Sequence, residues 1–118
     1  MPYVDGYVMP VPTRNVAECR RLARIAAKVW REHGALEYRE CIGDDLDIES
    51  GTNFRRMTGG RPRETVVFAW IVHRSRAHRD RGNATALADP RIAKMMTLKP
   101  PFDAGRLAFG GFRMIVDG

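Results

Sequence analysis

The sequence predicts an α+β fold with the element order β-α-β-β-α-β, the ferredoxin-like pattern of an antiparallel four-stranded sheet with both helices on one face. The first observation is the segment 64–73, ETVVFAWIVH, which is apolar on both faces and therefore typical of a strand covered on both sides. The second is that the rest of the chain offers only two longer helical segments, enough to cover one face. We therefore expect the other face to meet a second copy of the chain.

Size and charge fit one globular domain over residues 1–118. A chain of this length buries roughly 65% of the surface that its unfolded form exposes. The composition, 44% hydrophobic and 29% charged, is too apolar for disorder. The net charge is +6, but the arginines are interleaved with acidic residues. We interpret the densest basic cluster as solvated surface rather than a nucleic-acid site; it comprises Arg74, Arg76, Arg79 and Arg81.

The sequence carries no sign of export or membrane insertion. The two cysteines, Cys19 and Cys41, lack C-x-x-C spacing, and we interpret them as reduced thiols. The N-terminal segment lacks the basic and apolar regions of a signal peptide. No apolar run reaches the ~18 residues of a transmembrane helix. We therefore expect a cytoplasmic protein with no membrane contact.

The N-terminal third predicts a strand followed by a helix. Residues 3–11 alternate well enough for a strand, which ends at prolines. Asn15 is placed to cap the helix, and Glu18 to complete a variant of the capping box. An apolar stripe at three- and four-residue spacing continues from Val16 to His33, and Gly34 is placed to end the helix.

The middle of the chain predicts an edge strand, a long loop and the apolar strand 64–73. Residues 36–43 alternate charged and apolar side chains, which is typical of an edge. Residues 44–63 form a polar loop of a length that is often functional or mobile. The first and third strands carry the least charge, so we expect them at the centre of the sheet and the second and fourth at its edges.

The remainder predicts a helix, a short helix and a final strand. Ser75 is placed to cap a helix that runs to about Ala88, and Asp89-Pro90 opens the short one. Residues 106–117 form the last strand, in which the pair Gly110-Gly111 is expected to mark a bulge or sharp twist.

Several blocks of the sequence, among them YVDGYVMPVP, ETVVFAWIVHRSRAHRD and PFDAGRLAFGGF, closely resemble the YbaA-like family of small uncharacterised bacterial proteins. The resemblance covers nearly the whole chain. It implies membership in the dimeric α/β-barrel superfamily, in which two ferredoxin-like subunits pack their sheets face to face with the helices outside. That superfamily includes cofactor-free monooxygenases, haem-degrading enzymes, dehydratases, isomerases and ligand-binding regulators, so the fold alone indicates no single reaction.

Asp5 is the sharpest candidate for chemistry. It lies in the middle of a predicted central strand, between Tyr3 and Tyr7 on the same face. A carboxylate in a sheet interior must be paired or have a raised pKa. If Asp5 lines a cavity, it is a candidate general base, with a tyrosine such as Tyr7 holding an oxyanion. The alternative is an ion pair with an arginine of the fourth strand, such as Arg113.

Tyr38 and Glu40 share a face of the second strand, where they either add a second acid to the same cavity or stand in water at an edge. The aromatic pair of the third strand either stacks on a flat substrate or fills the barrel. We expect that pair to point into the barrel and Val67, Ala69 and Ile71 to lie beneath the helices. The predicted ligand pocket is completed by Tyr3, Phe68, Trp70 and His33.

No metal site or tightly bound cofactor is predicted. The histidines lack i, i+4 spacing, and no clustered Cys/His pattern exists. The acidic run from Asp45 to Glu49 lacks the glycine placement of a calcium loop. The main hypothesis is a homodimer that binds or transforms a small organic molecule in a barrel pocket. The alternatives are a non-catalytic structural or interaction dimer, or, less favoured, an RNA-binding protein.

Overall fold

Four strands form one antiparallel sheet in the computed structural model, which describes residues 1–118. Its order is β2-β3-β1-β4, so the first and third strands are central and the second and fourth are edges, as expected from their charge. Neighbouring strands are antiparallel throughout. The strand bounds are β1 Tyr3–Pro12, β2 Glu37–Ile42, β3 Glu64–His73 and β4 Ala108–Arg113.

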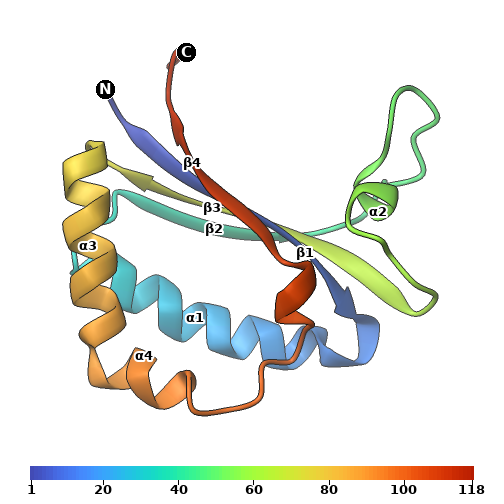
Figure 1. Ribbon diagram of the computed structural model, residues 1–118, viewed down its shortest axis with the longest axis horizontal. Coiled ribbons are helices and arrows are strands. Elements are labelled where there is room, and N and C mark those ends of the chain that lie inside the picture. The colour runs from blue at the N-terminus through green and yellow to red at the C-terminus, as the bar shows by residue number, and fades with distance from the viewer.

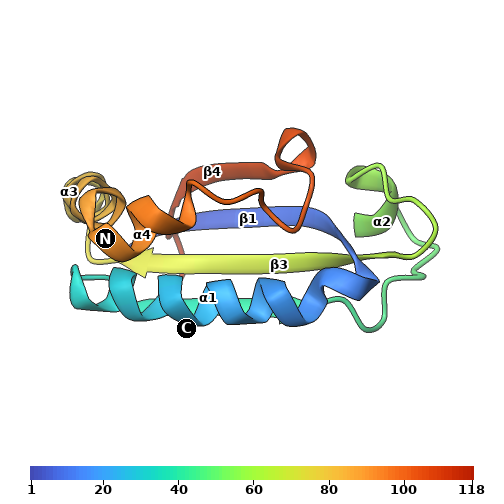
Figure 2. The same cartoon turned by 90° about the horizontal axis from the view of Figure 1, so that it is seen from below.

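Three of the helices pack on one face of the sheet, and the other face is open (Figure 1). Figure 2 shows the longest helix, α1, running along the strands, with α3 and α4 grouped at one end. The short α2 lies on the open side, within the long loop between β2 and β3 (Figure 1). The helix bounds are α1 Val16–Glu32, α2 Phe54–Met57, α3 Arg76–Ala88 and α4 Pro90–Met95, with 3₁₀ turns at Thr13–Asn15 and Ala104–Arg106.

The strand register determines which side chains face the helices. Ala69 of β3 pairs with Tyr7 of β1 on one side and with Glu40 of β2 on the other, so these three side chains share the helix-facing side. Phe68 is one residue out of step and lies on the open face, as does Trp70. The expected facing of β3 is therefore observed.

Two predicted helix caps are confirmed and one is wrong. Ser75 accepts a hydrogen bond from the backbone N–H of His78 at 3.2 Å, and Asp89 caps α4. Asn15 makes no capping hydrogen bond, because a 3₁₀ turn leads into α1. Its side-chain amide instead donates to the Pro101 carbonyl at 2.9 Å. The cap residue thus fastens a distant segment rather than its own helix.

The expected bulge at Gly110-Gly111 is wrong, because β1 and β4 pair without interruption through both glycines. Gly111 instead makes room for the Tyr3 ring, which would collide with any Cβ at that position. The strand itself is shorter than predicted, since a 3₁₀ turn occupies Ala104–Arg106. Within the long loop the sequence analysis also missed α2, which Asn53 caps by accepting from the Arg56 N–H at 2.8 Å.

Apolar packing is concentrated on the helix-facing side of the sheet. One buried cluster joins β1, α1 and β3 through Met9, Cys19 and Val67, and a second joins α1, α3 and α4. On the open face large apolar side chains remain in solvent; Phe68 is 43% exposed and Phe112 62% exposed. No helix has both the length and the apolar character needed to cross a bilayer.

Candidate functional site

Asp5 belongs to an internal ion pair, not to a cavity. It is 4% exposed and points from β1 toward α3. Arg79 donates from Nη1 to Oδ1 at 3.1 Å, and Asn83 donates from Nδ2 to Oδ2 at 3.3 Å. With a guanidinium and an amide as its partners and almost no exposed surface, this carboxylate is out of reach of a substrate. The predicted role as general base is therefore not supported by the geometry, and the expected alternative partner, Arg113, is replaced by Arg79.

Tyr3 and His73 complete this internal cluster. The Arg79 guanidinium lies 4.8 Å from the centroid of the Tyr3 ring and donates to the Tyr3 hydroxyl at 3.3 Å. His73 is 1% exposed, with Nε2 3.7 Å from an Asp5 oxygen, and burial lowers its pKa. The cluster ties α3 to the two central strands, so Tyr3 has a structural role here rather than a place in a ligand pocket.

A cavity of about 470 Å³ lies between the helix-facing side of the sheet and the helices. This volume is within the range of about 300–1,000 Å³ that is typical of small-molecule sites. The sheet contributes Tyr7, Tyr38 and Glu40, and α1 contributes the small residues Ala23 and Ala26 that leave the space open. Most of the remaining wall is apolar, so the polar groups of the cavity are few and come mainly from two strands.

Glu40 is the ionisable group best placed for chemistry in this cavity. Burial raises the pKa of its carboxyl, and interaction with the Tyr38 hydroxyl only partly opposes that rise. The same burial, together with the nearby Glu40 charge, raises the pKa of Tyr38, so its hydroxyl keeps its proton. Burial and then the charge of Asp5 raise the pKa of Tyr7 to about 12. Beside Cys19 and Lys99, the cavity therefore holds one titratable carboxyl and two hydroxyl donors.

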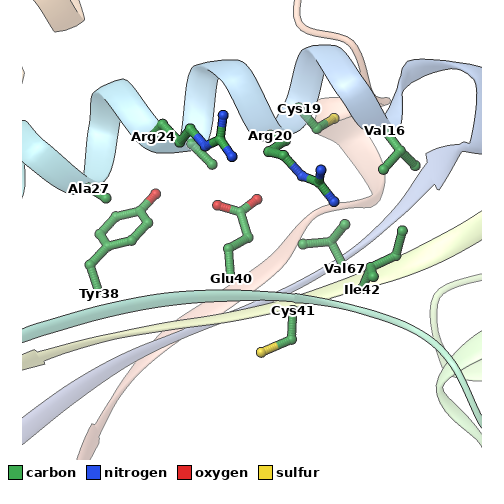
Figure 3. A pocket seen from close by; sticks show the side chains of 11 residues that line it. Val16, Cys19, Arg20, Arg24, Ala27, Tyr38, Glu40, Cys41, Ile42 and Val67 are labelled. Carbon is green, nitrogen blue, oxygen red and sulfur yellow. The ribbon is translucent and has the colours of Figure 1, made fainter.

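A second cavity of about 330 Å³ opens between α1 and β2 and shares Tyr38 and Glu40 with the first. Figure 3 shows the Tyr38 hydroxyl and the Glu40 carboxylate pointing from β2 toward α1, with Arg20 and Arg24 extending from the helix above them. Cys41 points to the opposite side of β2 (Figure 3). The Glu40 carboxyl can therefore be approached from both cavities.

The chemistry that this arrangement allows is proton transfer. A carboxyl with a raised pKa is a stronger proton acceptor when ionised than an ordinary glutamate, and it keeps its proton to higher pH. The protonated hydroxyls of Tyr38 and Tyr7 can donate hydrogen bonds to an oxygen that gains negative charge. An apolar wall excludes water and strengthens both interactions.

The remaining predicted pocket residues lie elsewhere. Phe68 and Trp70 are on the open face, with ring centroids 5.5 Å apart, and the Trp70 indole N–H donates to Glu37 at 3.1 Å. His33, at the end of α1, pairs with Asp89 at 3.1 Å. The predicted pocket thus combines residues from two opposite faces of the sheet, because the sequence does not reveal the register between strands.

The sequence analysis missed the part of the cavity wall that comes from the C-terminal third. Met95 and Met96 at the end of α4, and Phe102 and Leu107 beyond it, line the cavity. Met95 and Met96 belong to the predicted apolar side of the short helix, which nothing in the sequence linked to a pocket, and Phe102 and Leu107 lie in irregular chain without a periodic pattern. The one available signal was the row of alanines in α1, since small residues on a buried helix face leave room for something else.

Comparison with known proteins gives a family but no activity. The family model described as "Protein of unknown function (DUF1428)" matches residues 2–104. The chain is 38% identical over 117 residues to "Uncharacterized protein YbaA" of Escherichia coli K12, covering 99% of both chains, and equally to that of Shigella flexneri. Among solved structures it is similar to Rv0793 from Mycobacterium tuberculosis, with a TM-score of 0.61 and 14% identity over 99% of this chain and 98% of that one. This likeness supports the fold alone.

Proposed function

The chain belongs to the DUF1428 family of proteins of unknown function, and we propose that it binds a small organic molecule in the cavity between sheet and helices and exchanges a proton with it. The observation that carries this proposal is Glu40, a carboxyl of raised pKa beside the Tyr38 hydroxyl in the wall of a mostly apolar cavity of about 470 Å³. Glu40 is half-buried and makes no ion pair, although Arg20 and Arg24 extend above it. A carboxyl held in an apolar wall costs stability, so its presence calls for a use.

In this proposal Glu40 is the general base or acid. It takes a proton from a carbon or oxygen of the bound molecule, or returns one. Tyr38, and Tyr7 from the neighbouring part of the sheet, donate hydrogen bonds to the oxygen on which negative charge develops. Asp5, the base expected from the sequence, stays paired with Arg79 and holds the sheet and α3 in place.

We also propose that the protein is a homodimer whose two sheets pack face to face. The strand order β2-β3-β1-β4 with helices on one side supports a ferredoxin-like subunit. The central strands present an apolar open face, formed by Val4, Val8, Phe68, Trp70 and Val72. Pairing two such faces would give a dimeric α/β barrel, and a stable interface of this kind buries more than about 1,000 Å² in total.

Binding of a neutral fluorescent probe tests the location of the site. N-phenyl-1-naphthylamine fluoresces in apolar surroundings, and we expect saturable binding to the wild-type protein. Ala69→Phe places a large ring in the cavity wall and should abolish that binding, whereas Ala77→Phe, at an exposed position of α3, should leave it unchanged. Equal binding by Ala69→Phe and wild type would contradict the proposal.

The interaction dimer remains the second candidate, and the exposed Phe68 and Phe112 of the open face favour it. It differs from the first proposal in needing no cavity. An RNA-binding role through the cluster around Arg74 and Arg81 is less well supported, since Arg79 and His73 turn inward to Asp5. The arginines at positions 74, 76 and 81 are the ones left in solvent.

A further inference from the structure

A third pocket, of about 580 Å³, adjoins the apolar cavity and is polar and basic. It lies where β1 ends and β3 begins, against the 3₁₀ turn Ala104–Arg106. The two pockets share residues 99–102, which we call the strap. Figure 1 shows the strap within the orange-red segment that runs from α4 past the N-terminal end of α1. An apolar space and a basic one therefore meet at a single piece of chain.

Four cations of this basic pocket have no acidic partner. The side chains of Arg14, Arg61, Arg63 and Lys99 make no ion pair and no hydrogen bond; Arg61 meets Glu64 through its backbone N–H, at 2.8 Å. Both acids of the pocket pair with a fifth cation: Arg106 donates to Glu64 at 3.0 Å and to Asp103 at 3.1 Å, so five cations face two carboxylates. The pocket therefore keeps a surplus of positive charge that is free to meet an anion.

The backbone at Arg63 is held in a conformation that a non-glycine residue rarely adopts. Its φ is 66°, the one positive value at a residue other than glycine. The Arg63 carbonyl accepts from the Thr13 N–H at 2.9 Å, which joins the start of β3 to the end of β1. Such strain, of order 1–3 kcal/mol, is found preferentially at functional sites. Arg63 and Arg14, at the two joined strand ends, both line the basic pocket.

A single side-chain hydrogen bond holds the strap. The Asn15 amide donates to the Pro101 carbonyl at 2.9 Å, and no other side-chain hydrogen bond reaches residues 99–102. Phe102 lines both pockets, so this residue stands between the apolar space and the cations. Glu40, the acid of the cavity, comes from the edge strand β2 and not from this end.

We propose that the ligand of the cavity is an amphipathic anion, with a carboxylate or phosphate head held by Arg14, Arg61, Arg63 and Lys99 and an apolar body that passes the strap into the cavity. This inference rests on the proposed function and adds the class and the direction of the ligand. The head is placed at the basic pocket because an anion beside Glu40 would meet a carboxylate of like charge. Contacts to the head are remote from the reacting atoms and serve to position the far end of the body, which carries the oxygen that gains charge, against Tyr38 and Glu40.

The test compares three molecules with the same apolar chain: decan-1-ol, decanoate and decyl phosphate. We expect both anions to displace N-phenyl-1-naphthylamine at concentrations at least about tenfold below that of decan-1-ol, which corresponds to roughly 1.4 kcal/mol. Added salt should weaken the two anions and leave the alcohol unchanged. The tighter of the two anions identifies the head group.

Two double variants with the same change in net charge locate the head. Arg61→Gln with Arg63→Gln removes two cations of the basic pocket, and Arg74→Gln with Arg76→Gln removes two exposed cations at the opposite end of β3. We expect the first to bring decanoate binding to the level of decan-1-ol and the second to leave it unchanged. Circular dichroism and thermal unfolding confirm that each variant is folded.

The outcomes separate this inference from the proposed function. If decan-1-ol and decanoate bind wild type equally well, or if both double variants weaken decanoate equally, the amphipathic anion is wrong while the cavity stands. If none of the three molecules displaces the probe from wild type, both proposals are wrong. Loss of the preference for decanoate in the 61/63 variant alone supports the inference.

Discussion

At the scale of single residues, the structure gives different roles to side chains of the same type. Asp5 and Glu40 are both carboxyls on the helix-facing side of the sheet. Asp5 meets a guanidinium and an amide, while Glu40 meets a tyrosine hydroxyl and an apolar wall. The first environment holds a structural charge, and the second leaves a carboxyl available for proton exchange.

Removing the partner of Asp5 should destabilise the protein. Arg79→Met leaves a nearly buried carboxylate without its counter-ion, and we expect a loss of about 3 kcal/mol in the free energy of unfolding. Arg113→Gln, at the exposed residue that the sequence suggested as the partner, should change it by less than about 0.5 kcal/mol. Urea unfolding measures both. Equal effects of the two substitutions would show that the Asp5–Arg79 pair does not hold α3 to the sheet.

Replacing Glu40 should stabilise the protein at neutral pH. Its folded pKa is raised, so the folded state binds more protons than the unfolded state above the ordinary value of 4.5, and stability falls as pH rises through that region. Glu40→Gln removes this dependence, and we expect a gain of about 0.5–2 kcal/mol at pH 7. Little difference should remain below pH 4. Unfolding in urea at pH 4 and pH 7 checks this; a variant less stable than wild type at pH 7 would refute it.

At the scale of elements, local chemistry in the sequence predicted where helices and strands lie but not all of their contacts. Ser75 and Asp89 cap the expected helices because capping depends on residues two or three positions away. Asn15 makes its hydrogen bond 86 positions away, and no local pattern announces that. Gly111 was likewise misinterpreted as part of a bulge, because its contact is with Tyr3 of another strand and no local pattern reveals that contact.

The two glycines of β4 provide a matched pair for the packing of Tyr3. Gly111→Ala places a methyl group against the Tyr3 ring, and we expect a loss of about 1–3 kcal/mol in the free energy of unfolding. Gly110→Ala is the matched control, since it lies in the same strand. Its methyl group meets open space, so it should cost much less. Thermal unfolding of both variants gives the comparison. If Gly110→Ala were the more harmful change, the placement of Tyr3 over Gly111 would be wrong.

At the scale of the whole molecule, the sequence predicted the order of elements and the central strands, since strand charge reports the position in a sheet. It predicted the two faces of β3, but not which residues of β1 and β2 share each of them. Tyr7 and Glu40 line a cavity on one side, while Phe68 and Trp70 lie on the other. A one-residue change of register exchanges these faces, so only the paired strands identify which residues form a site together.

The open face carries the prediction about assembly. Phe68→Glu places a charge in the middle of the proposed interface, and we expect it to convert a dimer to a monomer in sedimentation at micromolar concentration. Leu36→Glu, at another exposed apolar residue just before β2, should leave the dimer intact. A wild-type protein that sediments as a monomer would refute the face-to-face dimer, and the cavity within each subunit would remain.

The location of the ligand is the central claim, and the methionines report it directly. Met9, Met95 and Met96 line the cavity, whereas Met57 belongs to α2 on the open side of the sheet. With ¹³C-labelled methionine methyl groups, addition of decanoate should shift the NMR signals of the three cavity methionines and leave Met57 unchanged. A shift of Met57 with unchanged signals from Met9, Met95 and Met96 would contradict the account, because the ligand would then lie on the opposite face of the sheet.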